Sequence, residues 1–475
     1  MSILFVSSEA VPYSKTGGLA DVAGSLPVAL QELGCEVTLA LPLYRETERM
    51  AADRIPAVEG VSYRLDRTGV RVLFVEHSGY FGRPGIYGEK GVDYPDNLRR
   101  FNYFTQKVLE HCKSEGFAPD ILHLNDWQCA LFPLYLKESV WGGSRFFAKT
   151  KTVFTIHNLA YQGLFEAGDF AATGLSKDWM NVEALEFYGR INLLKGGITQ
   201  SDALTTVSPS YSREIQRKEF GCGLEGVLKQ RASDLTGILN GLDIDEWDPE
   251  IDEALEVNYT AEVLEDKALN KKALQRELGL VTHFDGPLVG VVSRLASQKG
   301  VDLLVEVAKA IYALGMQLVV LGTGDPFYEE ALKALAGQYP EEIAAVIGFD
   351  SRLARRIYAG SDIFLMPSRY EPCGLGQMIS LRYGAVPVVR ATGGLRDTVS
   401  AYRAPAEGTG FLFEEYRAKA LVQTLQEAMA VYHQPELWKA LVRRGMSGEF
   451  SWTASARKYL KLYRSLCENV TVEVP

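Results

Sequence analysis

The chain has 475 residues, and because single hydrophobic cores stop growing at about 250–300 residues, this length predicts two domains. Hydrophobic residues make up 47% and charged residues 23% of the chain, a globular composition that excludes a fibrous protein and extended disorder. The formal net charge of −10 argues against nonspecific binding to nucleic acid or to an anionic membrane surface, but it allows a local basic site for a phosphate.

Short apolar runs rich in β-branched residues recur along the whole chain, separated by segments long enough for a helix. This pattern is typical of parallel strands that are buried on both faces, and it predicts an α/β fold. In the first half, strands are predicted at residues 3–6, 36–41, 70–76, 121–124, 152–156, 204–207 and 237–239. In the second half, they are predicted at residues 288–292, 317–321, 344–347, 363–366 and 386–389.

The clearest unit is a βαβ element, in which an amphipathic helix from about residue 19 to residue 33 follows the first strand and a glycine-rich turn. Asn240-Gly241 is a turn signal, and residues 243–265 are polar and acidic with little strand pattern. A new series of strands begins at residue 288. We therefore expect one Rossmann-like domain at residues 1–242 and a second at residues 243–455.

The Thr-Gly-Gly-Leu motif at residues 16–19 recurs at residues 392–395. Each copy follows a predicted strand and opens a helix, where free N–H groups and the helix dipole attract anions. Each copy therefore predicts a phosphate site, and two such sites imply a ligand between two domains. The alternative is that Thr-Gly-Gly only provides a turn between a strand and a helix.

Basic side chains accompany these turns. Lys15 precedes the first Gly-Gly pair, and Arg294 and Lys299 follow strand 288–292 at the edge where open α/β sheets bind ligands. Two cations there suit a diphosphate, although each could instead be a solvated surface residue. A Walker A loop is absent and Gly322-Thr323-Gly324 lacks the third glycine of a dinucleotide fingerprint, which disfavours nucleotide hydrolases and dehydrogenases.

Further polar residues follow other predicted strands. Glu371 lies after strand 363–366, where its carboxylate can accept sugar hydroxyls while amides near Cys373 and Gly374 donate. Cys373 has no histidine near it in sequence, so a small half-buried thiol is favoured over a nucleophile. His157 and Asp126 also follow strands; either is a candidate site residue, or His157 is structural and Asp126 caps a helix.

The sequence predicts no metal site, no disulfide framework and no membrane span. The six cysteines are scattered without zinc-like spacing, which suits a reducing cytoplasm. Asp243-Ile244-Asp245 resembles a metal-binding Asp-x-Asp, but it stands in an acidic segment without other ligands, so a metal-free diphosphate site is preferred. The N-terminus has no basic segment, and no apolar run reaches the about 18–20 residues of a membrane helix.

Together the motifs resemble those of the bacterial glycogen synthase and plant starch synthase family, over essentially the whole chain. The matching segments are Lys15 to Val22, Ile156-His157-Asn158, Asn240-Gly241, Ser293-Arg294-Leu295, Gln298-Lys299-Gly300, Glu371-Pro372-Cys373-Gly374-Leu375 and Thr392-Gly393-Gly394-Leu395. Two positions depart from it: the family commonly has Thr where Gly376 stands, and the wider superfamily often has a second glutamate where Ile379 stands.

The resemblance implies a GT-B glycosyltransferase, with two Rossmann-like domains that face a central cleft. The first domain would be the acceptor side, the second would bind the nucleotide sugar, and a C-terminal helix at about residues 456–475 would cross back onto the first domain. The implied reaction is the transfer of glucose from ADP-glucose to the non-reducing 4-OH of an α-1,4-glucan such as glycogen, with retention at the anomeric carbon. No cofactor and no metal are implied.

The family also assigns roles to matching residues. The implied catalytic set is Arg294, Lys299, Glu371, His157 and Asp126. The implied substrate-binding set is Lys15, Gly17, Gly18, Asn158, Asn240, Cys373, Gly374, Leu375, Thr392 and Gly393. The two cations would neutralise the diphosphate, Glu371 would hold the glucosyl hydroxyls, and His157 and Asn240 would contact the region of the 6-OH.

Retention usually requires a carboxylate nucleophile and a separate acid/base, and the resemblance supplies no such pair. The hypothesis is therefore a front-face displacement, in which the leaving diphosphate accepts the proton of the incoming 4-OH. The rival functions are a transferase for UDP-glucose or for a small acceptor, a catalytically silent glucan-binding protein, and a glycogen phosphorylase. Members of the last family are much longer and depend on pyridoxal phosphate.

Overall fold

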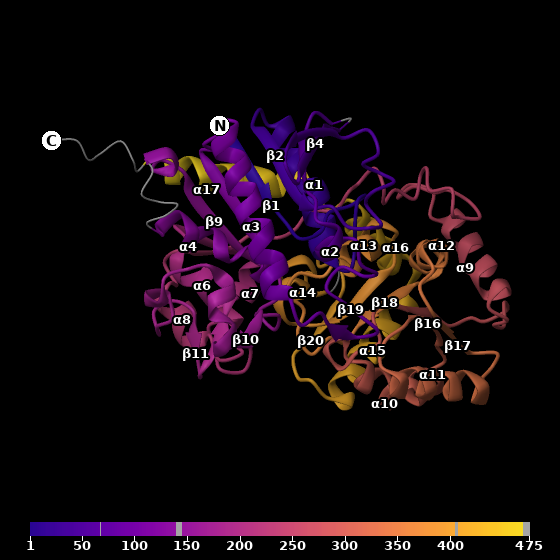
Figure 1. Ribbon diagram of the computed structural model, residues 1–475. Coiled ribbons are helices and arrows are strands. Elements are labelled where there is room, and N and C mark those ends of the chain that lie inside the picture. Colours follow the sequence, from indigo (N-terminus) through magenta and orange to yellow (C-terminus); the bar gives the residue numbers. More distant parts are fainter. Residues whose placement is uncertain (67, 139–144, 404–406, 469–475) are drawn as a thin grey trace. The chain divides into compact units, whose positions relative to one another are not determined.

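The computed structural model describes residues 1–66, 68–138, 145–403 and 407–468, which form two compact units. The first unit consists of Met1–Gly241 and Trp452–Pro475, and the second consists of Leu242–Ser451. Each unit is built around a largely parallel sheet flanked by helices (Figure 1). The predicted α/β class is therefore confirmed in both units. Residues 469–475 of the predicted returning helix lie outside the described ranges.

The N-terminal unit has a nine-stranded sheet in the order β14-β13-β9-β8-β1-β2-β5-β4-β3. The strands are β1 (Ser2–Val6), β2 (Glu36–Pro42), β3 (Ile55–Val58), β4 (Val61–Leu65), β5 (Arg71–Val75), β8 (Ile121–Asn125), β9 (Lys151–Ile156), β13 (Ala203–Thr206) and β14 (Leu235–Gly237). The strands from β14 to β5 are parallel, whereas β4 and β3 are antiparallel. The carboxyl ends of β1, β8 and β9 therefore lie next to one another at one edge.

Short antiparallel elements and helices complete this unit. Two small sheets are formed by β10 (Leu164–Glu166), β11 (Glu186–Phe187) and β12 (Arg190–Asn192), and by β6 (Gly88–Glu89) and β7 (Val92–Asp93). The helices are α1 (Gly18–Glu32), α2 (Ser78–Phe81), α3 (Asn97–Ser114), α4 (Leu131–Lys137), α6 (Leu193–Gln200), α7 (Pro209–Glu214), α8 (Glu225–Gln230) and α17 (Trp452–Glu468). Four 3-10 helices are η1 (Trp127–Cys129), η2 (Arg145–Phe147), η3 (Ala167–Thr173) and η4 (Lys177–Trp179). Helix α1 continues through Pro27 without a break.

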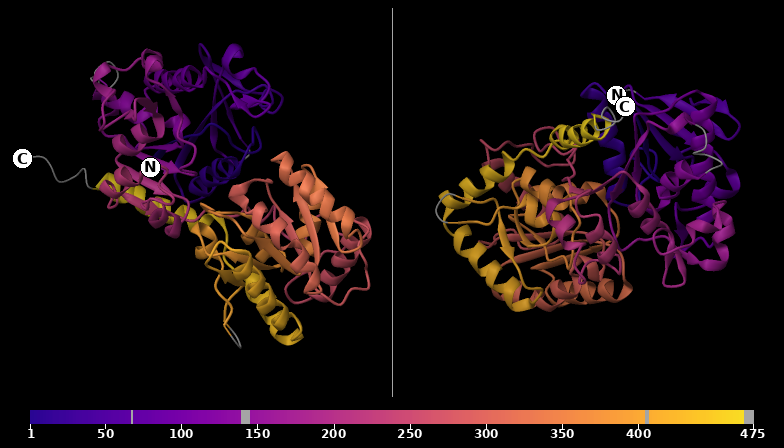
Figure 2. Two further views of the ribbon diagram at one scale, coloured as in Figure 1. Left: turned by 90° about the horizontal axis from the view of Figure 1, so that it is seen from below. Right: turned by 90° about the vertical axis from the view of Figure 1, so that its left-hand side faces the viewer.

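The C-terminal helix α17 belongs to the core of the N-terminal unit, where it packs on α1 (Figure 2). Trp452, Tyr459 and Tyr463 of this helix are buried in the same apolar cluster as Ile3 and Leu26. Its polar groups are also used, since the Tyr463 hydroxyl lies 2.5 Å from His123 Nδ1 in β8. The last helix of the chain therefore stabilises the first domain rather than the second.

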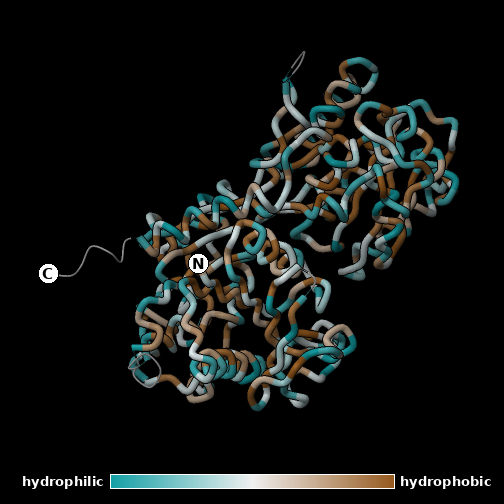
Figure 3. Tube along the Cα trace, turned by 90° about the horizontal axis from the view of Figure 1, so that it is seen from above, coloured by the Kyte–Doolittle hydropathy of each residue, from teal (hydrophilic) through white to brown (hydrophobic). Residues whose placement is uncertain are grey.

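The C-terminal unit has a parallel six-stranded sheet in the order β17-β16-β15-β18-β19-β20. The strands are β15 (Leu288–Val292), β16 (Gln317–Gly322), β17 (Ile343–Ile347), β18 (Ile363–Met366), β19 (Val386–Arg390) and β20 (Phe411–Phe413). The helices are α9 (Glu265–Glu277), α10 (Val301–Ala313), α11 (Pro326–Gln338), α12 (Ser351–Gly360), α13 (Gly376–Arg382), α14 (Gly393–Thr398), α15 (Ala418–Tyr432) and α16 (Pro435–Met446), with the 3-10 helix η5 (Ser297–Lys299). The hydrophobic segments gather inside each unit (Figure 3).

Each predicted strand has a counterpart in the structure, and within the two large sheets the differences lie at or next to an edge. The strand predicted at 237–239 lies earlier, at Leu235–Gly237, because it pairs with β13 in the register Leu204↔Leu235. The edge strands β3 and β20 and the antiparallel β4 were not predicted. Strands β3 and β20 are short and their pairing depends on a neighbouring strand, so local hydrophobicity alone identifies them poorly.

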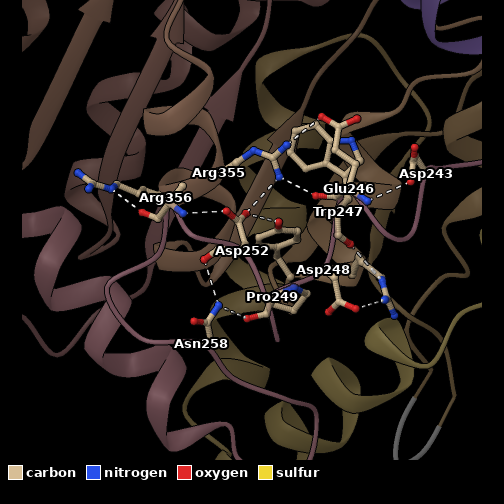
Figure 4. A network of polar contacts seen from close by, with 12 residues as sticks. Asp243, Glu246, Trp247, Asp248, Pro249, Asp252, Asn258, Arg355 and Arg356 are labelled. Atoms are coloured by element: carbon tan, nitrogen blue, oxygen red, sulfur yellow. Dashed lines mark hydrogen bonds and ion pairs between the residues drawn. The ribbon is translucent and has the colours of Figure 1, made fainter. Parts of the chain in front are cut away.

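The acidic segment after the first unit is held firmly on the second unit (Figure 4). We call residues 243–258 the acidic segment. Arg355 in α12 donates to the Glu246 carbonyl oxygen at 2.7 Å and to Asp252 Oδ2 at 3.2 Å, and it stacks 4.3 Å from the centre of the Trp247 ring. Asp252 is buried and accepts a bond from the Tyr383 hydroxyl at 2.5 Å. The charges of this segment are therefore used for anchoring.

Candidate active site

The candidate residues of the N-terminal unit follow neighbouring parallel strands. Asp126 follows β8, His157 follows β9, and Glu9 lies just beyond β1. All three side chains are buried. Because these strands are adjacent in the sheet, their carboxyl ends bring these polar side chains to one edge, which is where open α/β sheets bind ligands.

Asp126 links the ends of two strands. Its backbone has a left-handed φ of 56°, an uncommon conformation for a residue other than glycine. Its N–H donates to the Thr155 carbonyl oxygen at 3.0 Å, and its Oδ1 accepts from the His157 N–H at 2.8 Å. The side chain forms no capping bond with η1, so the alternative of a helix-capping aspartate is wrong. Burial raises the pKa of Asp126 to about 7.

The side chain of His157 is fixed by a hydrogen bond as well. Its Nε2 lies 2.8 Å from Oδ1 of Asn125, the last residue of β8. Burial lowers the pKa of His157 to about 3, which keeps the imidazole neutral. The predicted neighbour Asn158 uses its Oδ1 to accept from the Ala160 N–H at 3.1 Å, so it shapes the loop after β9.

The first Thr-Gly-Gly turn presents its glycines to open space. A Cβ atom added to Gly17 or Gly18 would meet no protein atom within 4 Å, although Gly18 opens α1. This is the room that an anion needs in order to approach the start of a helix. Lys15 beside the turn is half exposed and pairs with Asp21 at 2.6 Å.

Glu9 is a functional candidate that the sequence analysis missed. Its Oε2 accepts from the Thr16 N–H at 2.5 Å and from the Thr16 hydroxyl at 2.8 Å, and the side chain is only 3% exposed. Burial raises the pKa of Glu9 to about 7. This carboxylate therefore fixes the turn that carries Lys15 and Gly18. The signal that could have found it is its place in the polar run Ser7-Ser8-Glu9 directly after the first strand.

Asn240 ends the N-terminal unit with a buried amide. Its Oδ1 is buried, and no hydrogen-bond partner for it occurs among the residues that the structure describes. A buried amide oxygen without a partner costs free energy of about 1–3 kcal/mol, so such an atom is well suited to accept a bond from a ligand.

In the C-terminal unit, two predicted residues form one ion pair. Lys299 Nζ lies 2.9 Å from Oε1 and 2.7 Å from Oε2 of Glu371. Ser368 donates to the same carboxylate at 3.0 Å, and Glu371 is buried. Arg294 is exposed and donates to Gln298 Oε1 at 3.1 Å. The carboxyl edge of β15 and β18 thus presents two cations and one oriented carboxylate.

The second Thr-Gly-Gly turn has a different role from the first. A Cβ atom on Gly393 would lie 1.9 Å from the Glu371 carbonyl oxygen, and one on Gly394 would lie 2.1 Å from the Cys373 carbonyl oxygen. The Gly394 N–H already donates to the Glu371 carbonyl oxygen at 3.1 Å. These glycines therefore let the loop that carries Glu371 pack closely, so the two copies are not equivalent anion sites.

The loop around Cys373 is shaped by a glutamine. Cys373 is buried and belongs to no disulfide, and Gly374 has a left-handed φ of 76°. Gln377 donates to the carbonyl oxygens of Cys373 at 3.1 Å and of Gly374 at 3.0 Å. Leu375 follows and precedes α13. The buried amide of Gln377 thus fixes the backbone of Cys373 and Gly374, whose N–H groups were predicted to donate hydrogen bonds to a ligand.

The two positions that depart from the family pattern, Gly376 and Ile379, both lie in α13. A Cβ atom on Gly376 would lie 3.2 Å from the Phe364 ring and 3.3 Å from the Tyr358 hydroxyl, so a threonine there requires small shifts. Ile379 is buried and contributes no polar atom.

Two exposed aromatic residues follow strands β16 and β17, at the carboxyl edge of the second sheet. They are Phe327, which is 73% exposed, and Phe349, which is 90% exposed, and neither was identified as a candidate from the sequence.

The described part of the chain holds neither a cluster of metal ligands nor a helix that could span a membrane. Within it, no group of three or more His, Cys, Asp or Glu side chains is arranged to hold a metal ion. The Asp243 carboxylate accepts from the Asp245 and Glu246 N–H groups at 3.1 and 3.0 Å, so it shapes a turn. None of the described helices is both long and apolar enough to span a bilayer.

Comparisons with known proteins cover nearly the whole chain. Residues 2–230 match the family described as starch synthase catalytic domain, and residues 281–444 match glycosyl transferases group 1. The chain is 48% identical to a glycogen synthase of Syntrophotalea carbinolica over 98% of this chain and 99% of that protein. It is 49% identical to a glycogen synthase of Anaeromyxobacter dehalogenans over 98% of this chain and 100% of that protein.

Solved structures show the same architecture. The catalytic domain of starch synthase IV from Arabidopsis thaliana, bound to ADP and acarbose, matches with a TM-score of 0.87 and 33% identity over 98% of this chain and 99% of that one. A sucrose-phosphate synthase from Thermosynechococcus elongatus matches with a TM-score of 0.62 and 19% identity over 98% of this chain and 99% of that one. The second similarity shows the fold alone.

Proposed function

Since this chain belongs to the glycogen synthase and starch synthase family, we propose that it transfers glucose from ADP-glucose to the non-reducing 4-OH of an α-1,4-glucan. The proposal includes retention at the anomeric carbon. The starch synthase of similar structure was solved with ADP and acarbose, which supports an adenine nucleotide as the donor and a glucan as the acceptor.

The observation that carries the proposal is the ion pair between Lys299 and Glu371, 2.7 Å apart at the carboxyl edge of β15 and β18. A diphosphate needs a cation, and a glucosyl group needs an acceptor for its hydroxyls. Here the cation Lys299 and the acceptor Glu371 lie next to each other. Ser368 donates a hydrogen bond to the Glu371 carboxylate, and Arg294 is close to Lys299 in sequence. Arg294 can bind phosphate oxygens with two parallel bonds, whereas Lys299 acts as a point charge.

The proposed mechanism is a front-face displacement. The bond between the anomeric carbon and the diphosphate oxygen breaks while the bond to the incoming O4 forms on the same face. The proton of the 4-OH passes to the leaving diphosphate oxygen, whose growing charge is stabilised by Arg294 and Lys299. Both oxygens of Glu371 are bonded to Lys299, so this carboxylate binds sugar hydroxyls rather than acting as a nucleophile.

We propose that neutral and buried groups of the N-terminal unit take part in the same reaction. His157 and Asn240 would contact the glucosyl 6-OH region, Asp126 would lie beside the reacting sugar, and Lys15 with the Gly18 amide would assist at the donor. The Oδ1 atom of Asn240, which has no partner among the described residues, and the neutral imidazole of His157 support these roles, because both can accept a hydrogen bond from a hydroxyl.

The test is Lys299→Ala, assayed with saturating ADP-glucose and maltotriose by following both ADP release and chain extension. We expect kcat to fall about 10²–10³-fold, the loss that follows removal of one preorganised group that stabilises transition-state charge. Lys333→Ala is the control, because Lys333 lies exposed in α11 and pairs only weakly with Glu330. Near-wild-type turnover of Lys299→Ala would contradict the mechanism. Faster turnover of the wild-type protein with UDP-glucose than with ADP-glucose would contradict the proposal that ADP-glucose is the donor.

A further inference from the structure

We propose that Asn125 is a positioning residue that fixes the neutral imidazole of His157 in the tautomer protonated at Nε2. In this tautomer Nδ1 is a hydrogen-bond acceptor, so His157 binds a substrate group that donates a hydrogen bond. That group would be a sugar hydroxyl, a conclusion that rests on the proposed glucosyl transfer. The tautomer itself follows from the protein alone.

The first step is the orientation of the Asn125 amide. Asn125 is the last residue of β8 and is fully buried. Its Nδ2 donates to the carbonyl oxygen of Val6, the last residue of β1, at 2.9 Å. A backbone carbonyl oxygen can only accept hydrogen bonds, so the NH₂ group of Asn125 must face Val6. The same oxygen also accepts from the Cys129 thiol at 3.4 Å, which agrees with its role as an acceptor.

The second step is the proton on His157. Once the NH₂ group faces Val6, the Oδ1 atom of Asn125 faces His157 Nε2 at 2.8 Å. An amide oxygen has no proton to give, so Nε2 must donate. A neutral imidazole carries one N–H only, and Nδ1 is therefore left with a lone pair. The chain of bonds runs across three adjacent strands, from β9 through β8 to β1.

The surroundings favour the neutral ring. Burial lowers the pKa of His157 to about 3. The nearby Asp126 carboxylate is bonded to the backbone N–H of His157, and among the described residues no carboxylate is bonded to the ring. His123 of the neighbouring strand β8 is neutral as well, and its ring bonds to Tyr463 and Thr155.

The consequence is a choice between ligand groups. An ionised phosphate oxygen has no proton to donate, so it cannot bond to a lone pair on Nδ1, whereas a hydroxyl can. Asn125 thereby directs His157 toward sugar hydroxyls and away from the diphosphate. In the opposite tautomer His157 would present a donor, and the preference would be reversed.

The test observes the ring directly in the full-length protein without any donor. Protein labelled with ¹⁵N-histidine contains six histidines, and the signals of His157 are assigned by their loss in His157→Gln. Long-range ¹H–¹⁵N correlation spectra distinguish the two neutral tautomers and the charged ring. We expect His157 to show only the tautomer protonated at Nε2 between about pH 5 and 8. The Nδ1-protonated form, or a charged ring at neutral pH, would overturn the proposal.

Two substitutions of similar size then separate positioning from packing. Asn125→Asp keeps an acceptor facing Nε2 and adds a negative charge, so the tautomer should persist while the pKa of His157 rises. Asn125→Leu removes the acceptor, so both tautomers should appear and kcat/KM should fall about 10–100-fold, as for loss of other supporting hydrogen bonds. A pure Nε2-protonated ring together with wild-type kcat/KM in Asn125→Leu would also overturn it.

Asn102→Leu is the matched control, because Asn102 is a buried asparagine of α3 in the same unit that donates to the Ala172 carbonyl oxygen at 2.8 Å. It should lose stability and leave the His157 signals unchanged. If Asn125→Leu fails to fold, the wild-type spectra and Asn125→Asp still decide the question. Because these spectra need no substrate, a failure of ADP-glucose transfer would contradict the proposed function without affecting the tautomer.

Discussion

Individual side chains at the edge of the N-terminal sheet are tuned by burial. Glu9 and Asp126 follow the neighbouring strands β1 and β8, and burial raises the pKa of each to about 7. Glu9 accepts two bonds from Thr16, yet the described residues place no lysine, arginine or histidine in an ion pair with it. A buried carboxylate without a cationic partner is costly in its charged form, so these two groups make stability depend on pH.

We predict that Glu9→Gln removes part of this pH dependence. The folded protein holds the Glu9 proton up to about pH 7, whereas the ordinary pKa is 4.5, so the folded state binds more protons in this window. Stability is therefore lost as the pH rises through it. Between about pH 5 and 8, the free energy of unfolding of wild type should fall by up to about 3 kcal/mol relative to Glu9→Gln, measured by urea denaturation.

Glu59→Gln serves as the control for this measurement, since Glu59 is an exposed carboxylate of the same unit. Its stability should follow that of wild type at every pH. Parallel curves for wild type and Glu9→Gln would show that Glu9 titrates alike in the folded and unfolded states, against the prediction.

At the scale of elements, helix α12 anchors the acidic segment. Arg355 contacts Glu246 and Asp252 and stacks on Trp247, so one guanidinium holds three residues of the segment (Figure 4). The planar fork makes this possible, and a lysine ammonium could neither bond in parallel to these oxygens nor stack in the same way. The segment is therefore part of the second unit, although its sequence reads like a linker.

We predict that Arg355→Lys destabilises the C-terminal unit by about 1–3 kcal/mol, because a single ammonium group cannot keep the bonds to the buried Asp252 carboxylate and to Glu246 together with the stacking on Trp247. Thermal unfolding and limited proteolysis at residues 243–258 should both report the change. Arg352→Lys in the same helix is the control, because Arg352 is exposed. Equal stability and equal cleavage of the two variants would argue that the anchor is unimportant.

At the scale of the whole molecule, the chain leaves the first unit after Gly241 and returns to it at Trp452, and the residues at these two crossings are hydrogen-bonded neighbours. Leu242 and Ser451 form a parallel bridge, and the Leu242 N–H donates to the Phe450 carbonyl oxygen at 2.6 Å. In the first unit, Gly241 lies against Trp452. A Cβ atom added to Gly241 would lie 2.5 Å from the Trp452 backbone. The start of α17 and the end of the N-terminal sheet thus depend on a glycine.

We predict that Gly241→Ala destabilises the protein by about 1–3 kcal/mol, because overpacking forces two backbone segments apart. The thermal midpoint should fall, and α17 should exchange its amide hydrogens faster. Gly337→Ala is the control: this helical glycine of α11 has open space around it, and alanine there should be neutral or stabilising by up to about 1 kcal/mol. Similar midpoints for wild type and Gly241→Ala would refute the prediction.

Sequence patterns alone were sufficient for the fold class and for the family. Apolar runs predicted the buried parallel strands because burial on both faces demands such runs, and the comparisons confirm the family that the motifs resembled. The same patterns identified Lys299 and Glu371 as candidates, because polar residues that follow buried strands must lie at one edge of the sheet. Their roles in catalysis remain proposals.

Only the tertiary structure distinguished the two Thr-Gly-Gly turns and showed which groups Glu9 and Asn125 bind. The turns are alike in sequence, but Gly17 and Gly18 face open space whereas Gly393 and Gly394 face the backbone of another loop. Asn125 acts on His157 across a strand boundary, at a separation of 32 residues along the chain. Local patterns report the conformation of a segment and its preference for burial. The partner that each buried polar atom meets is decided by strand order and register, which arise only when distant segments pack together.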